Sequence, residues 1–169
     1  MLNVSKVLVD GGILTAAFLV LIVAVVYFKP RLFLNKEDLP ADIMAAVPPK
    51  TEAEKRQASL LGFPIFSILI GGMLVSTYTF YLQSEAGFVL LFLHALIIIL
   101  MISVSDLVLL DWVMLNTITP KWAVFPGTEG FAGYKDYGFH LRAHLRALPA
   151  QVLGAAVTAG LVLLAGMVV

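Results

Sequence analysis

Four segments of about 20 or more mostly apolar residues constrain the fold more than any other feature of this chain. They cover residues 8–28, 61–82, 87–113 and 148–169, and none of them contains a lysine or an arginine. A helix needs roughly 20 such residues to cross a hydrocarbon layer about 30 Å thick. The sequence therefore predicts an all-α fold, an integral membrane four-helix bundle, in which residues 1–169 form a single membrane domain.

The composition agrees with a chain that lies mostly in lipid. Hydrophobic residues make up 60% of it and charged residues only 13%, whereas a soluble domain carries about 25% charged residues. The first apolar run ends at Lys29, Pro30 and Arg31, without the small residues of a cleavage site. We therefore expect it to be retained as a helix.

The basic residues predict how the helices are oriented. Six of the 11 lysines and arginines lie in residues 29–60, four lie in residues 114–147, and the last is Lys6. Because basic loops stay in the cytoplasm, both long loops are expected there, with the two termini and the turn at residues 83–86 outside. This gives an N-out/C-out, multi-pass protein of the cytoplasmic (inner) membrane.

Charge and cysteine content exclude several kinds of function. The formal net charge is zero, which argues against nucleic acid as a partner because phosphate binding needs a basic surplus. The chain has no cysteine, so disulfides, thiol redox chemistry and thiolate metal sites are excluded. The expected partners are the lipid membrane and either a second copy of the chain or another membrane protein.

The two long loops should contain short structure of their own. Thr51 and Glu54 have the spacing of a capping box, so a helix should begin near residue 52 and lead into the second span, with Pro64 bending it or marking where the span begins. The preceding part of residues 29–60 is rich in proline and is expected to form an interfacial strap. In residues 119–140, glycines and prolines indicate a turned loop. Its aromatic residues are expected to anchor it at the bilayer surface, namely Trp122, Phe125, Phe131, Tyr134, Tyr137 and Phe139.

The first candidate site lies at the cytoplasmic end of the third span. Asp106 should lie at the edge of the hydrocarbon, where a carboxylate is costly unless it faces water or a partner. Asp111 follows five residues later, which on a straight α-helix places it about 140° around the axis from Asp106. From such a helix the two carboxylates could not share one metal ion.

A helix beginning near Asp136 should bring histidines to the same boundary. His140 and His144 are four residues apart and so lie one turn apart on one helix face. Two such histidines can chelate a divalent metal when carboxylates complete the shell. The alternative is that both are interfacial residues on a helix facing lipid headgroups, with Asp111 paired to a basic residue. The candidate polar or ligand site comprises Asp106, Asp111, Glu129, Tyr134, Asp136, His140 and His144.

A second polar group is expected within the membrane, nearer the outer face. The short turn at residues 83–86 makes the second and third spans an antiparallel hairpin, which places His94 level with Ser76 and Thr77. Ionisable groups inside membranes are functional by default, so a proton or ion relay is one interpretation, and a single satisfied hydrogen bond is the other. His94 is two to three turns too far from His140 for a shared haem iron, so haem is not expected.

The segment from Asp111 to His144 resembles a family of small bacterial four-helix integral membrane proteins of uncharacterised function. The resemblance is carried by Asp111-Trp112 and by the strings TPK at 119–121, PGTEG at 126–130 and YKDYxFH at 134–140. It covers about a fifth of the chain. It implies a bacterial cytoplasmic membrane and four helices, and it implies no reaction.

Three functions are compatible with these patterns. The first is a non-catalytic accessory or oligomeric module whose 114–147 loop binds a partner or lipid headgroups. The second is a membrane-interface metal-dependent enzyme or metal-binding protein that uses the Asp/Glu/His cluster. The third is an oligomeric transporter of ions or small solutes, with His94 and Asp106 on one pathway.

Overall fold

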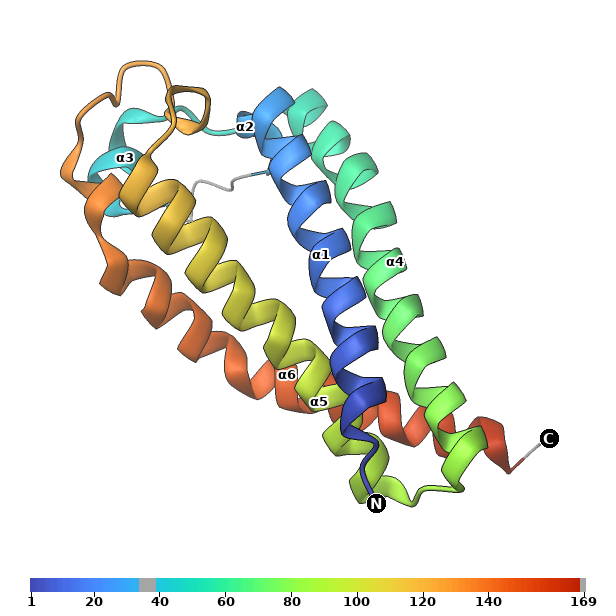
Figure 1. Cartoon of the computed structure of the whole chain (residues 1–169). Coiled ribbons are helices and arrows are strands. Elements are labelled where there is room, and N and C mark those ends of the chain that lie inside the picture. The colour runs from blue at the N-terminus through green and yellow to red at the C-terminus, as the bar shows by residue number, and fades with distance from the viewer. Residues whose placement is uncertain (34–38, 168–169) are drawn as a thin grey trace.

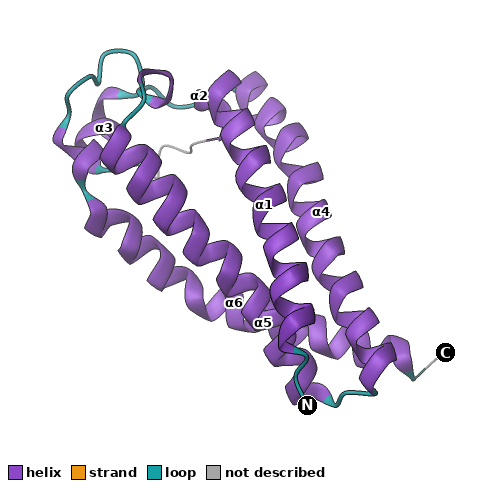
Figure 2. Ribbon diagram, in the orientation of Figure 1, coloured by secondary structure: helices purple, strands orange, loops and turns teal. Residues whose placement is uncertain are grey.

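The computed structural model describes residues 1–33 and 39–167, and within this part of the chain all regular secondary structure is helical (Figure 2). The predicted four long apolar helices are confirmed, and each is long and apolar enough to cross a membrane. Lys36 and the last two residues of the predicted span 148–169 lie outside the described residues. The four helices are α1 (Val4–Phe28), α4 (Glu52–Ser84), α5 (Phe88–Ser105) with its continuation η2 (Asp106–Ile118), and α6 (Tyr137–Gly166).

Short elements gather at one end of the molecule, opposite the two chain termini (Figure 1). They belong to the two long connections that the sequence analysis assigned to one side of the membrane. These elements are the helices α2 (Pro30–Phe33) and α3 (Ala41–Ala46) and the 3₁₀ turns η3 (Lys121–Ala123) and η4 (Ala132–Lys135).

The long helices pack as two pairs that meet at the end where the termini lie. Helix α1 packs against α4 and α5, and α6 packs against α5 and α4. Towards the other end the α1–α4 pair and the α5–η2–α6 pair splay apart, and the short elements lie there (Figure 1). Side chains such as Leu14, Met73 and Ile98 fill the contact between the pairs. The outward faces carry many exposed apolar side chains, as helices surrounded by lipid require.

Local signals in the sequence set where two of the long helices begin. The predicted capping box is present: the Thr51 side chain accepts from the Glu54 backbone N–H, and the Glu54 carboxylate accepts from the Thr51 N–H. Helix α4 then continues through Pro64. Asp136 caps the start of α6 by accepting from the Phe139 N–H, and α6 runs without interruption from the loop into the predicted span.

The expectation that the loop aromatics anchor at the bilayer surface is wrong for Phe125 and Tyr134. Both are buried, in a cluster that also contains Leu39, Ile43 and Val47 from the strap segment around α3. The Tyr134 hydroxyl accepts from the Phe125 backbone N–H and bonds to the buried Thr128 hydroxyl. The loop and the strap therefore form one folded unit, because each covers the apolar side of the other.

Candidate metal centre

Two aspartates of η2 and two histidines of α6 converge at the splayed end of the molecule. His144 Nε2 lies 3.1 Å from Asp111 Oδ2 and 3.8 Å from Asp106 Oδ2. His140 Nδ1 lies 3.3 Å from Asp111 Oδ1. The side chains of Asp111 and His140 are each only 15% exposed, so the four groups form a partly enclosed polar cluster between two long helices.

The pitch of η2 brings the two aspartates together. Residues Asp106–Ile118 form a π-helix, which has more residues per turn than an α-helix because its hydrogen bonds span i to i+5, so residues five apart lie close together on one side of the helix. The expectation that Asp106 and Asp111 point about 140° apart is therefore wrong, because it assumed α-helical pitch. π-Helical turns are rare and occur frequently at functional sites.

Three of the four groups have the spacing of metal ligands. One donor atom each from Asp106, Asp111 and His144 lies within 4.8 Å of the other two. His140, which is one turn earlier on α6 than His144, contacts Asp111. Three protein ligands of nitrogen and oxygen, with a further position left for water or substrate, are the pattern of catalytic zinc sites.

A second layer of side chains orients His144. Ser103 Oγ lies 3.0 Å from His144 Nδ1, and Gln151 Nε2 donates to the same Oγ. When Nδ1–H donates to Ser103, the lone pair of Nε2 faces the two carboxylates, which is the tautomer that a metal requires. Without a metal, an Nε2–H can instead donate to Asp111, so metal binding exchanges this proton for the ion.

Lys135 closes the end of the π-helix. Its ammonium donates to the backbone carbonyls of Asn116 and Thr117 and to the Thr119 hydroxyl, so it satisfies carbonyls that a helix end leaves free. Trp112 Nε1 donates to the Tyr137 carbonyl and joins η2 to the start of α6. These contacts fix η2 and α6 relative to each other and hence the distance between aspartates and histidines.

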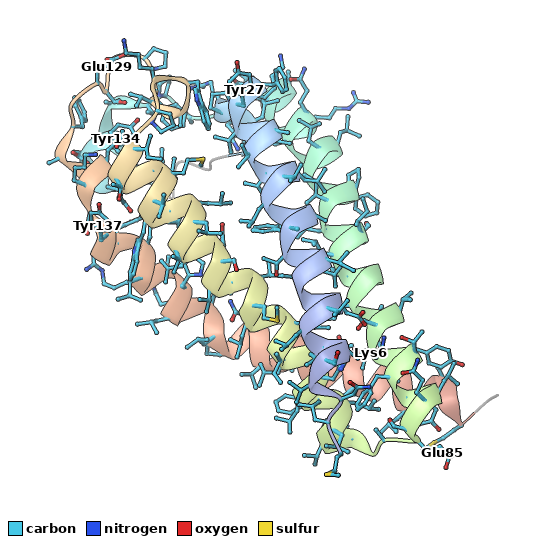
Figure 3. The ribbon with its side chains drawn as sticks, in the orientation of Figure 1. Lys6, Tyr27, Glu85, Glu129, Tyr134 and Tyr137 are labelled. Carbon is cyan, nitrogen blue, oxygen red and sulfur yellow. The ribbon has the colours of Figure 1, made fainter. Side chains whose placement is uncertain are left out.

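A cavity of about 470 Å³ adjoins the cluster. Asp106, Asp111, His140 and His144 all line it, and residues 39–40 together with α3, η2, η3, η4 and α6 contribute the rest of its wall. The cavity lies at the end where the labelled Tyr134 and Tyr137 are seen, far from Lys6 and Glu85 (Figure 3). A ligand in this cavity would contact the candidate metal site directly.

The other predicted site residues lie outside the cluster. Glu129 is exposed in a turn and accepts from the Gly127 backbone N–H. Asp136 caps α6 and pairs with Arg142 at 3.4 Å. Tyr134 lines the cavity, but its hydroxyl is bonded to Phe125 and Thr128. None of these three supplies an atom to the candidate metal ligands found among the described residues.

The predicted intramembrane group lies at the opposite end. His94 is fully buried, with Nε2 2.8 Å from Ser76 Oγ and its ring stacked on Phe80 at 4.8 Å. The Ser76 hydroxyl donates to Asp10, which pairs with Lys6 at 2.7 Å. Thr77, by contrast, donates to the Met73 carbonyl of its own helix.

Packed apolar side chains separate the two polar groups. Ala95 and Ile98 lie between His94 and Asp106 on α5, and both are fully buried. They belong to an apolar cluster that spans the contact between the helix pairs. The described residues therefore show no polar connection from one group to the other.

The sequence analysis missed four polar residues of the two groups. Gln151 in the middle of α6 and Asn116 near the end of η2 are uncharged residues in mostly apolar surroundings and gave no signal of their own. Lys6 and Asp10 are spaced i,i+4, a signal of an ion pair on one helix face, but nothing in the sequence related that face to His94.

Comparison with protein-family models, curated proteins and solved structures finds no match. The resemblance of residues 111–144 to a bacterial membrane family stays a prediction.

Proposed function

We propose that this chain is an integral membrane protein that binds a divalent metal ion at the cytoplasmic boundary of the membrane, in a site suited to metal-dependent catalysis. One observation carries the proposal: donor atoms of Asp106, Asp111 and His144 lie within 4.8 Å of one another. His140 adjoins them, and the group lines a cavity.

The donor set limits which metals fit. Imidazole nitrogen and carboxylate oxygen suit Zn²⁺, Mn²⁺, Fe²⁺ and Co²⁺, and no thiolate is present to favour a softer ion. A bound metal also compensates the two aspartates, which are costly in a partly buried position without a cation. Water on such a metal is acidified and becomes a nucleophile near neutral pH, so hydrolysis is the class of reaction that the site suits best.

The placement at the cytoplasmic boundary is part of the proposal. The described parts of the two long connections, which carry basic residues such as Lys50 and Lys135, lie at the same end of the helices as the metal cluster. Cytoplasmic loops of membrane proteins carry the excess of lysine and arginine. The bacterial inner membrane, suggested by the resemblance of residues 111–144, is proposed on the same basis.

The other two functions are less well supported. A docking module should present the aromatic residues of its 114–147 loop, yet Phe125 and Tyr134 are buried against the strap. A pathway through His94 and Asp106 would have to pass the packed side chains of Ala95 and Ile98. Association with a second copy or another membrane protein is compatible with the metal site and stays a proposal.

Calorimetric titration of the purified, chelator-treated protein with Co²⁺ or Zn²⁺ tests the proposal. We expect one ion per chain, and a loss of affinity of at least about tenfold in Asp111→Asn or His144→Ala, as for removal of a metal ligand or its orienting partner. Acidification should weaken binding in the wild type because protonated imidazole cannot bind a metal.

Asp136→Asn is the matched control, since it removes a carboxylate from the same end of α6 and asparagine still caps a helix. It should bind the metal like the wild type. Equal affinity in all variants, or no binding by the wild type, would reject the proposed function.

A further inference from the structure

The wall of the cavity is mainly apolar apart from the metal cluster. Ile43 of α3, Leu115 of η2 and Phe139 and Ala147 of α6 contribute to it. A small hydrophilic substrate would leave these surfaces in contact with water or unfilled. Burying them against a ligand is favourable by about 25 cal/mol per Å² of apolar surface, so the cavity favours a ligand with an apolar part.

The charges around the cavity favour an anion once the metal is bound. Two aspartates and one divalent cation sum to zero, with both histidines neutral. Arg146 also lines the cavity and adds one positive charge. Among the described residues no carboxylate pairs with Arg146, whose Nε donates to the Arg142 carbonyl. Its terminal nitrogens retain the fork geometry that binds phosphate and carboxylate.

Asn116 supplies a second, independent indication of a ligand. It is 1% exposed and lines the cavity, and its Nδ2 donates to the Tyr134 carbonyl. That bond fixes the amide orientation, so Oδ1 is an acceptor, and Oδ1 has no donor among the described residues. A buried acceptor without a donor is costly, and a hydroxyl or ammonium group of a ligand would satisfy it.

We propose that this cavity binds a phosphate-bearing amphiphile, with the phosphate between the metal and Arg146, a hydroxyl or ammonium group near Asn116, and the apolar part along Leu115, Phe139 and Ala147. This inference rests on the proposed metal site, because without the cation the two aspartates would repel a phosphate. Membrane phospholipids and free phosphate share the anionic group, and the apolar wall distinguishes between them.

The test uses a soluble short-chain lipid, dihexanoyl phosphatidylglycerol, whose headgroup carries both the phosphate and free hydroxyls, titrated into the detergent-solubilised full-length protein with and without Co²⁺. We expect binding to the Co²⁺-loaded protein that weakens at least about tenfold without the metal, consistent with loss of a charged contact. Inorganic phosphate has the anionic group without the apolar part, and dihexanoyl glycerol has the apolar part without the phosphate. Each should bind at least about tenfold more weakly than the lipid.

Two variants separate this inference from the metal site itself. Arg146→Gln and Ala147→Trp should weaken binding of the lipid and leave Co²⁺ binding unchanged, because neither residue supplies a metal ligand. Arg142→Gln, four residues earlier on the same helix and exposed, is the control and should bind the lipid like the wild type.

The outcomes are distinguishable. Co²⁺ binding without any lipid binding would overturn the inference and leave the proposed function standing. If inorganic phosphate bound as tightly as the lipid, the inference of an amphiphilic ligand would be overturned, and the ligand would be a free phosphate. No Co²⁺ binding at all would reject both proposals.

Discussion

At the scale of single residues, the interior polar side chains near the chain termini are linked by direct contacts between helices. At the end near the termini, Lys6, Asp10, Ser76 and His94 form a chain of three contacts across α1, α4 and α5. The Ser76 hydroxyl has one proton, and it goes to Asp10 when that carboxylate is ionised. His94 must then donate through Nε2–H, so its Nδ1 is an acceptor, and this atom is buried with no partner among the described residues.

Ser76→Ala tests the contribution of this chain to stability. It removes the shared partner of Asp10 and His94, and we expect the free energy of unfolding in detergent to fall by about 1–2 kcal/mol. Ser84→Ala is the control, since the Ser84 hydroxyl donates to the Phe80 carbonyl of its own helix and to no other helix among the described residues. Thermal unfolding of both variants gives the comparison, and equal stability of the two would contradict this role for Ser76.

Part of this residue-level arrangement followed from the sequence. Counting outward from the short turn at residues 83–86 placed Ser76 level with His94, and the structure has a hydrogen bond between them. The contact of Asp10 and Lys6 with this pair was not predictable, because a hydropathy pattern gives the length of a helix and not which of its faces packs against a neighbouring helix.

At the scale of elements, the π-helix η2 is the feature that the sequence did not predict. Residues 106–118 are mostly apolar with isolated polar positions, and the same pattern fits an α-helix. In an α-helix Asp106 and Asp111 would point about 140° apart, and in the π-helix they share a face. Which of the two forms depends on the tertiary contacts that hold η2, such as those of Lys135. The four residues of the cluster were therefore predictable as candidates, whereas their convergence was not.

The contact between α3 and η4 depends on the absence of a side chain at Gly133. The Gly133 N–H donates to Asp42 Oδ2 at 2.9 Å. A Cβ at this position would overlap the Asp42 carboxylate and the Cβ of Pro40. The strap that covers one side of the cavity therefore requires glycine at position 133.

Gly133→Ala should displace α3 from the loop and destabilise the protein by about 1–3 kcal/mol, the usual cost of overpacking. Limited proteolysis should then cleave the connection between α1 and α4 faster than in the wild type. Gly71→Ala is the control, because a Cβ there meets nothing within 4 Å. Proteolysis of Gly133→Ala at the wild-type rate would show that the strap does not depend on this contact.

At the scale of the whole molecule, hydropathy predicted the four long helices because the cost of exposing backbone and charge to lipid leaves few alternatives. Hydropathy did not predict which helices pack against each other, nor that the loop aromatics Phe125 and Tyr134 are buried beneath the strap. Both depend on side-chain fit between segments far apart in the chain. The grouping of both basic connections at one end agrees with the proposed orientation.

The orientation can be tested with single cysteines, since the chain has none of its own. Glu85 and Glu129 lie at opposite ends of the molecule (Figure 3) and are both exposed. In intact cells a membrane-impermeant maleimide should label Glu85→Cys, and it should label Glu129→Cys only after the membrane is permeabilised. The reverse pattern would place the metal site on the outer side.

The most direct measurement of the central claim is X-ray absorption spectroscopy of the Co²⁺-loaded protein in detergent. The claim predicts a shell of nitrogen and oxygen at about 2.0–2.2 Å with the outer-shell scattering of imidazole, and it predicts that this imidazole signal falls in His144→Ala and persists in Asp136→Asn. A shell without imidazole, or one that does not change in His144→Ala, would contradict the convergence of Asp106, Asp111 and His144 on one ion.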